Sequence, residues 1–379
     1  MENVNRKRLI TQFKKLVTTD SETKDEGNIA QLLKETFTNL GVTVEEDDAK
    51  KMTGHGANNL ICTLKGTNEK AEAIFFSAHM DTVKPGKNIK PQLIDNYITS
   101  DGSTILGADD KAGIAAMLEL IHYLQENDVP HGDIQFIITV GEEAGLTGAK
   151  ALDRSLVFAK RGFVLDSDGD VGNIVIEAPY HVKLFANITG KSAHAGIAPE
   201  KGVSAINVAA KAVSKMKLGR IDEETTANIG YFKGGKKEQT NVVSDFVEIE
   251  AEVRSLNETK VNRVTETLKE TFITTANALS GEATVETHLE YPGYKITKDD
   301  PLVKTVKRAT EKLHLPCNVL KSGGGSDANI LNSYGLKTVN LSVGYEHIHT
   351  TKERIHIDSL VNLTKLLVVI VEEMNNSAT

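Results

Sequence analysis

The feature that most constrains the fold is a short apolar run, residues 74–81, that ends in His79 and, two positions later, Asp81. Its Ile and Phe side chains are typical of a buried central strand in a parallel sheet. Such sheets bind ligands at the carboxyl ends of their strands, so His79 is expected where chemistry occurs. Asp81 can accept a hydrogen bond from the second ring N–H of His79, which would orient the imidazole toward a metal ion. The alternative is that His79 is simply a polar residue at the end of a strand. The metal-site interpretation is favoured if other predicted strands end in similar side chains.

Other predicted elements present similar side chains at the same expected edge of the sheet. The full set, from four strands and one helix start, is His79, Asp109, Glu142, Glu143, Asp166 and His349. Single members have simpler explanations: Asp109 or Asp110 could cap a helix, and the two glutamates could form a charged loop. Together, two histidines and several carboxylates match a pair of zinc-like ions about 3.5–4 Å apart. The sequence contains no His-Glu-x-x-His pattern, which excludes a zincin.

The chain length and composition limit the class of protein. A chain of 379 residues predicts two domains, and 40% hydrophobic with 25% charged residues is the balance of a globular protein with a sizeable core. The net charge of −8, without a Lys/Arg-rich stripe, argues against nucleic-acid or anionic-membrane partners. Small-molecule or peptide substrates are therefore expected.

Cysteine usage and the N-terminal residues bear on the compartment. Cys62 and Cys317 are too few for a disulfide framework, and both have apolar surroundings in the sequence. The first residues lack the apolar core of a signal peptide, and the longest apolar run, near 366–371, is too short to span a bilayer. We expect a cytoplasmic protein.

The hydrophobic pattern changes between residues 179 and 291, where it predicts an inserted domain. The predicted order is a strand at 181–189, a helix at 203–216, strands at 226–232 and 242–254, a helix at 261–279 and a strand at 283–289. This β-α-β-β-α-β order is typical of a ferredoxin-like α+β domain. The remaining segments, 1–178 and 292–379, are expected to form one discontinuous α/β domain around a mostly parallel sheet.

Five segments together resemble the co-catalytic zinc exopeptidases, the superfamily of peptidase T, dipeptidases, glutamate-releasing carboxypeptidases and aminoacylases. The segments are 79–81, 107–113, 141–143, 192–196 and 349–353. They occur in the family's order over nearly the whole chain, and the likeness is greatest to peptidase T-like tripeptide aminopeptidases. The resemblance implies a zinc-exopeptidase catalytic domain whose inserted domain is a lid and a possible homodimer surface.

The resemblance also implies roles for the clustered residues. Asp109 would bridge two metals, with His79 and Asp166 on one and Glu143 and His349 on the other. Glu142 would be the general base, and Asp81 would support His79. The Thr-x-x-Glu run after His349 favours it over His347, the alternative ligand. Zinc is the expected metal, although cobalt and manganese also accept this ligand set.

Further residues are implied for the substrate. The resemblance makes His194 an oxyanion-stabilising donor, which in some relatives reaches across a dimer. Arg254 and Asn241 resemble substrate-binding positions, and an arginine suits bidentate capture of a peptide carboxylate; a strand-end charge and a turn asparagine are the alternatives. Gly324, in the glycine run 323–325, could let the backbone approach a substrate, or could belong to a flexible turn. Peptidase T carries a basic residue where this chain has Gly323, a difference that bears on substrate preference.

The resulting prediction is a dinuclear-metal exopeptidase for short peptides, most simply an aminopeptidase that releases the N-terminal residue of tripeptides. A carboxypeptidase or N-acyl amino acid hydrolase of the same superfamily would use the same metal site. A non-catalytic binding module is the third alternative, which the presence of Glu142 and five ligands opposes.

Overall fold

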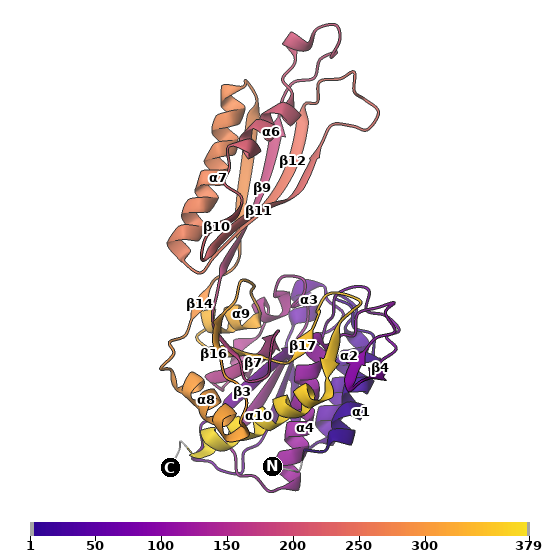
Figure 1. The fold of residues 1–379 in the computed structure, drawn as a ribbon, viewed down its shortest axis with the longest axis vertical. Helices are drawn as coiled ribbons and strands as arrows, with labels where there is room; N and C mark the ends of the chain where they lie inside the picture. The colour runs from indigo at the N-terminus through magenta and orange to yellow at the C-terminus, as the bar shows by residue number, and fades with distance from the viewer. Residues whose placement is uncertain (1–3, 377–379) are drawn as a thin grey trace. The chain divides into compact units, whose positions relative to one another are not determined.

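The computed structural model describes residues 4–376, which divide into two compact units (Figure 1). Unit 1 comprises, within the described residues, 4–176, 295–321 and 326–376. Unit 2 comprises Glu177–Tyr294 and the short segment Ser322–Gly325. The insertion predicted over 179–291 thus lies inside unit 2, and the glycine run belongs to unit 2 as well.

A nine-stranded sheet forms the centre of unit 1. Its strands are β1 (Thr43–Glu46), β2 (Leu60–Leu64), β3 (Ile74–His79), β6 (Ile134–Thr139), β7 (Arg161–Ser167), β8 (Ile174–Ala178), β14 (Tyr294–Lys295), β15 (Val319–Lys321) and β16 (Lys337–Ser342). The order is β1-β2-β6-β3-β7-β16-β8-β14, and β15 pairs with β8. The central strands β6, β3, β7 and β16 run parallel, whereas β1, β2 and β8 pair antiparallel. The predicted α/β class with a mainly parallel sheet is confirmed.

The apolar strands are central because every residue of β3 and β6 is buried. The rings of Phe76 and Phe163 stack with centroids 5.6 Å apart, and Phe136 lies 6.3 Å from Phe76 on the other side. In this register His79 lies opposite Thr139, so the ends of β3 and β6 are level. The metal-ligand candidates that follow these strands are therefore brought to one edge.

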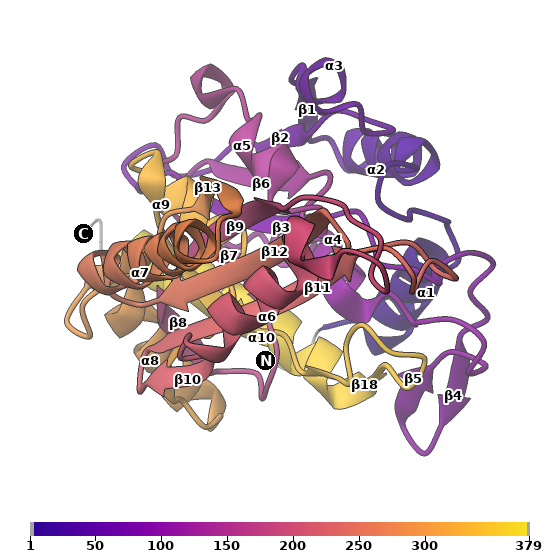
Figure 2. The same ribbon diagram turned by 90° about the horizontal axis from the view of Figure 1, so that it is seen from above.

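Helices cover this sheet. They are α1 (Arg6–Val17), α2 (Gly27–Asn39), α3 (Ala49–Thr53), α4 (Ala108–Glu126), α5 (Thr147–Lys150), α8 (Pro301–Leu313), α9 (Asp327–Ser333) and α10 (Ile357–Asn376). Helix α4 packs between α1 and α10, and α10 also packs on α8 (Figure 2). None of the helices within residues 4–376 is both long and apolar enough to cross a membrane.

A small antiparallel sheet, which the sequence did not predict, holds the late histidine loop. It contains β4 (Gln92–Ile94), β5 (Tyr97–Thr99), β17 (Tyr345–Glu346) and β18 (Arg354–His356) in the order β17-β18-β5-β4. The Arg354 guanidinium lies 4.3 Å from the centre of the Tyr97 ring and pairs with Glu346. These contacts close the hairpin whose loop, 347–353, carries His349.

Unit 2 has a five-stranded antiparallel sheet with helices α6 (Ala205–Ser214) and α7 (Glu258–Ala278) packed on it (Figure 1). Its strands are β9 (Tyr180–Thr189), β10 (Gly219–Asp222), β11 (Thr225–Gly234), β12 (Phe246–Ser255) and β13 (Glu282–Tyr291). The order β10-β11-β12-β9-β13 is the ferredoxin-like arrangement with β10 added at one edge. Strand β12 begins at Phe246 and not at Val242, because the N–H groups of Val243 and Ala205 tie residues 241–245 to the neighbouring loop.

Candidate metal centre and surrounding residues

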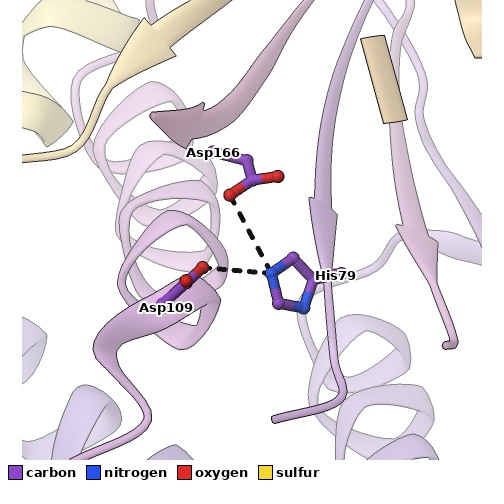
Figure 3. Close-up of side chains that lie close together, drawn as sticks. All are labelled: His79, Asp109 and Asp166. Carbon is purple, nitrogen blue, oxygen red and sulfur yellow. Dashed lines mark hydrogen bonds and ion pairs between the residues drawn. The ribbon is translucent and has the colours of Figure 1, made fainter. Parts of the chain in front are cut away.

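Three of the predicted ligands meet where β3, β7 and α4 come together. The Nε2 atom of His79 lies 3.1 Å from Asp109 Oδ1 and 3.9 Å from Asp166 Oδ1. Figure 3 shows the imidazole facing both carboxylates. The three side chains come from a strand end, a helix start and a neighbouring strand, and they can offer one ligand atom each to a single ion.

A second group shares Asp109 with the first. The Nε2 atom of His349 lies 3.2 Å from Asp109 Oδ2 and 2.9 Å from Glu143 Oε1. The two oxygens of Asp109 therefore face different imidazoles, His79 through Oδ1 and His349 through Oδ2. A carboxylate placed in this way could bridge two ions, and the two groups bring together the residues that the resemblance implied as ligands.

The backbone before α4 orients Asp109. Gly107 has a φ of +73°, which favours glycine, and Asp109 itself has non-helical angles of φ −82° and ψ 104°. Its carboxylate is thus directed to the imidazoles and does not cap the helix. Asp110 takes the capping role, because its Oδ1 accepts a hydrogen bond from the N–H of Gly113 at 3.2 Å.

Asp81 contacts His79 differently from the prediction. The Nδ1 atom of His79 lies 2.9 Å from the main-chain oxygen of Asp81, which accepts the ring proton, and 3.5 Å from its carboxylate. The carboxylate accepts two other hydrogen bonds, from the main-chain N–H of Glu142 at 3.0 Å and from the Thr23 hydroxyl at 2.8 Å. Asp81 therefore fixes the tautomer of His79 through its backbone and holds the Glu142 segment through its side chain.

Asp166 is held by residues from the late part of the chain. Asn340 accepts from the Asp166 N–H at 3.0 Å and donates to its carbonyl oxygen at 2.6 Å. The Tyr345 hydroxyl donates to Asp166 Oδ1 at 3.2 Å. These contacts fix the carboxylate on the side of His79.

Several buried carboxylates lie close together in the cluster, and both their burial and their mutual repulsion shift the pKa values of its members. Loss of hydration, followed by the charge of a neighbouring aspartate, raises the pKa values of Glu142 and Asp166 well above the ordinary range. Contacts with Asp109 and Glu143 raise the pKa of His349 to about 10. Burial lowers the pKa of His79, but its contacts with Asp109 and Asp81 outweigh burial and raise it well above the ordinary range. The carboxylates thus draw positive charge onto the imidazoles.

The donor set fits divalent cations. Within residues 4–376, the ion-pair partners of Asp109, Asp166 and Glu143 are the two imidazoles and no lysine or arginine. Neutral imidazoles and carboxylates are the ligands that zinc, cobalt and manganese accept. Two divalent cations would neutralise the negative charge of the clustered carboxylates and replace the protons on the imidazoles. The site would then be balanced in charge without a lysine or arginine.

Sequence reasoning missed two buried carboxylates next to the ligands. Glu353, inside one of the quoted segments, received no role, and its carboxylate accepts the main-chain N–H of Asp109 at 3.0 Å. Asp327 at the start of α9 accepts from the Thr139 hydroxyl at 2.5 Å, and burial raises its pKa to about 6. The only sequence signal near Asp327 is the helix-cap pattern Ser-x-x-Asn at 326–329, which predicts that a helix begins there but does not place Asp327 near the ligands.

Four predicted residues lie in unit 2. His194 is exposed in the loop after β9, where its Nδ1 accepts the N–H of Gly196 at 3.2 Å. The main-chain oxygen of Asn241 accepts from the Ala195 N–H at 2.8 Å, so Asn241 braces the His194 loop through its backbone. A Cβ added to Gly324 would meet only the Ser322 hydroxyl, at 3.9 Å.

Arg254, on β12, is engaged within unit 2. Its guanidinium donates to both oxygens of Glu252, each at 3.1 Å, and to the Tyr291 hydroxyl at 3.2 Å. Glu252 also lies 3.1 Å from His181 Nε2. Three of the five N–H groups of Arg254 are thereby used, and two stay available to an anionic ligand.

The parallel-centred sheet, the strand-end cluster of histidines and carboxylates and the separate α+β unit define a hydrolase fold of the exopeptidase type. The model of "Peptidase family M20/M25/M40" matches residues 75–373, and the chain belongs to this family. It is a peptidase, as the comparisons with individual proteins support.

Three proteins are similar over almost their full lengths. The solved structure of aminopeptidase PepT from Bacillus cereus is 56% identical, with a TM-score of 0.93 and coverage of 98% of this chain and 99% of that one. A tripeptidase from Staphylococcus aureus is 48% identical, with a TM-score of 0.96 and the same coverage. The uncharacterized protein YqjE of Bacillus subtilis is 54% identical over 370 residues, 98% of this chain and 99% of its own.

Proposed function

We propose that this protein is a dinuclear-metal aminopeptidase that releases the N-terminal residue of short peptides, most readily of tripeptides. The observation that carries the proposal is the division of the two Asp109 oxygens between His79 and His349, with Glu142 beside the cluster but outside both Asp109 groups. A carboxylate shared by two ions and a further carboxylate that acts as general base suit metal-assisted hydrolysis. Glu142 also lies near His79 and Glu143, and the resemblance assigns it the role of base rather than ligand. Similarity to an aminopeptidase and to a tripeptidase supports the choice of substrate.

Each side chain then has a defined task. His79 and Asp166 would hold one divalent ion, Glu143 and His349 the other, and Asp109 both. When bound, the ions supply Lewis acidity for the scissile carbonyl and make an attacking water more acidic. Glu142 accepts the proton of that water and donates it to the leaving amine nitrogen. The raised pKa of Glu142 suits a group that must both take up and release a proton.

Unit 2 supplies the substrate contacts in this proposal. The N–H groups of Arg254 that Glu252 and Tyr291 do not use would bind the C-terminal carboxylate of the peptide. Arg254 pairs with His181 at the start of β9, whereas His194 follows the far end of that strand, roughly 26 Å away. His194 would therefore donate to the oxygen that becomes negative in the site of a partner chain of the proposed dimer. Asn241 would act with His194, whose loop it contacts, and Gly324 would act at the Arg254 end, since the neighbouring Gly325 packs on Tyr291. Selection for short peptides follows if the carboxylate and the reacting carbonyl must be held at once.

We also propose a homodimer formed through unit 2 in the cytoplasm. Two large apolar side chains on the face of the sheet opposite the helices, Tyr231 on β11 and Phe246 on β12, are at least 40% exposed, which supports an interface there. Light scattering at working concentration should give twice the chain mass; a monomer with full activity would reject the dimer.

A substrate panel tests the proposed activity. Di-, tri- and tetrapeptides, their C-terminal amides and an N-acetylated amino acid would be incubated with the metal-loaded protein, and the products identified by mass. Free N-terminal residue from tripeptides is expected, and Glu142→Gln should lose about a hundredfold or more in kcat while retaining its metals. C-terminal release would instead indicate a carboxypeptidase, and preference for the acetylated compound would indicate an N-acyl amino acid hydrolase.

A further inference from the structure

The peptide group that joins Gly141 to Glu142 is held at both of its polar atoms by side chains that are not metal ligands. The carbonyl oxygen of Gly141 accepts a hydrogen bond from the Thr147 hydroxyl at 2.8 Å. The N–H of Glu142 donates to Asp81 Oδ1 at 3.0 Å. The Glu142 carboxyl thus projects from a backbone unit whose orientation is fixed from two sides.

A buried histidine stands behind Thr147. The Nε2 atom of His55 lies 2.7 Å from the Thr147 hydroxyl oxygen. The Thr147 hydroxyl contacts both His55 Nε2 and the Gly141 oxygen, so it connects the ring to the peptide group. His55 is only 4% exposed, so these contacts are shielded from water.

Glu26 lies against the other edge of the ring. Its Oε1 atom lies 3.1 Å from His55 Nδ1, and its Oε2 atom accepts the N–H of Gly56 at 2.7 Å. Glu26 is fully buried at the start of α2. The His55 ring therefore lies between a carboxylate, which is at ion-pair distance from Nδ1 without making a hydrogen bond to it, and the Thr147 hydroxyl, which contacts Nε2.

Packing leaves the ring no space to move toward the turn. Gly141 has a φ of +58°, and a Cβ atom added there would lie 2.2 Å from His55 Nε2. The turn can approach His55 this closely only because residue 141 is glycine.

The N–H side of the Gly141–Glu142 peptide group is also connected, through Asp81, to the loop between α1 and α2. Asp81 Oδ2 accepts the Thr23 hydroxyl at 2.8 Å, and Thr23 precedes Glu26 by three residues in the loop between α1 and α2. Two separate routes, Thr23 to Asp81 and Glu26 through His55 to Thr147, thus connect one loop to the two polar atoms of one peptide group.

We infer that His55, Thr147 and Thr23 are positioning residues. His55 and Thr147 act on one side of the Gly141–Glu142 peptide group and Thr23 on the other, and together they hold the Glu142 carboxyl where it can accept the proton of the attacking water. The inference rests on the proposed function, in which Glu142 is the general base. None of the three touches the reacting atoms; each acts through the Gly141–Glu142 peptide group. General bases lose efficiency when displaced by as little as about 1 Å, so a loosened peptide group should lower kcat.

A pair of variants separates the hydroxyl from the methyl group of Thr147. Thr147→Val removes the hydroxyl but retains the main-chain bond from the Thr147 N–H to the Gly141 oxygen at 3.1 Å. We expect kcat to fall about tenfold or more with unchanged KM and metal content, and Thr147→Ser to restore it. His55→Phe, which fills the space without the ring nitrogens, should behave like Thr147→Val. The control is Thr364→Val, because Thr364 is more deeply buried than Thr147 but its hydroxyl donates to the Leu360 oxygen within α10, away from the Glu142 segment.

A double variant shows whether the effect passes through Glu142. In a Glu142→Gln background, Thr147→Val should cause no further loss, because the group that it positions is already inactive. Full activity of Thr147→Val, or the same loss in both backgrounds, would overturn the inference. If Thr147→Val does not fold, Thr23→Val is used in the same cycle with the same expected result.

The outcomes separate the two proposals. No peptide turnover by the wild-type protein, or full activity of Glu142→Gln, would overturn the proposed function and the positioning role together. An inactive Glu142→Gln with a fully active Thr147→Val would overturn only the positioning role.

Discussion

Glu353 accepts the main-chain N–H of Asp109 at 3.0 Å, so a residue from the His349 loop holds the backbone of the bridging carboxylate. The second carboxylate oxygen of Glu353 accepts the N–H groups of Leu106 and Gly107 at 2.8 and 2.7 Å. Glu353 is 1% exposed, and burial raises its pKa to about 7. One buried side chain thus connects the loop that carries one imidazole with the segment that presents the shared aspartate.

Removal of Glu353 should affect both stability and metal binding. Glu353→Ala leaves three buried N–H groups without their acceptor, at roughly 1–3 kcal/mol for each unsatisfied group, so a loss of about 3 kcal/mol or more is expected. Urea unfolding and elemental analysis would measure the two effects. The control is Glu346→Gln, because the half-exposed Glu346–Arg354 pair should contribute no more than about 1 kcal/mol. Equal stability of the two variants would contradict the role of Glu353.

The choice between the two late histidines can be tested by metal counting. His349 contacts Asp109 and Glu143, whereas His347 faces a depression lined by Tyr97, Thr351 and Arg354. After loading with zinc, the wild-type chain should hold two ions, His349→Ala about one, and His347→Ala two. Chelation should abolish activity. A metal-free protein with full activity, or loss of an ion from His347→Ala instead, would reject this assignment.

Acid pH should weaken unit 2 through Glu252. Contact with His181, opposed by burial and aided by Arg254, lowers the pKa of Glu252 from 4.5 to about 2. Because the folded state binds this proton less tightly than the unfolded state, Glu252 stabilises the fold above pH 4.5, and the contribution is lost as the pH falls from 4.5 toward 2. Melting curves of the wild type and Glu252→Gln should differ most at pH 6, less at pH 3, and converge only as the pH approaches 2. A difference that stays constant over this range would show that the charge of Glu252 is irrelevant to stability.

The sequence could predict that the candidate ligands cluster, because each follows an apolar segment that becomes a strand or precedes one that becomes a helix. His79 and Asp166 end runs whose burial is encoded in Ile, Phe and Val side chains, and parallel strands bring their ends together. The position alone then suggests a shared site, without knowledge of distances.

The supporting contacts could not be predicted in this way. Glu26 and His55 are 29 positions apart and belong to no common pattern, so only the folded chain shows that they meet behind Gly141. Asp81 illustrates a subtler difference: the sequence placed a carboxylate near His79, but which oxygen accepts the ring proton depends on the backbone turn after β3. The start of β12 was predicted too early for a similar reason. The alternation of apolar and polar residues begins at Val242, but the backbone of residues 243 and 244 forms hydrogen bonds with Ala193 and Ala205 and not with a neighbouring strand.

Arg254 gives the sharpest test of substrate length selection. Glu252 and Tyr291 use three of its N–H groups and fix the plane of the guanidinium, and in the proposed function the other two N–H groups would bind the peptide carboxylate. Arg254→Met retains much of the apolar stem but removes the charge. A charge-assisted hydrogen bond contributes roughly 1.5–3 kcal/mol, so kcat/KM for a tripeptide should fall about tenfold to a hundredfold, mainly through KM.

The same substitution should matter little for a tripeptide amide, which has no carboxylate to bind. The ratio of kcat/KM for the acid to that for the amide should therefore be large in the wild type and close to one in Arg254→Met. Arg263→Met, on the exposed face of α7, is the matched control and should leave the ratio unchanged. If Arg254→Met slows acid and amide equally, Arg254 stabilises the fold of β12 with Glu252 and does not bind the carboxylate, and the preference for tripeptides must then arise elsewhere in the protein.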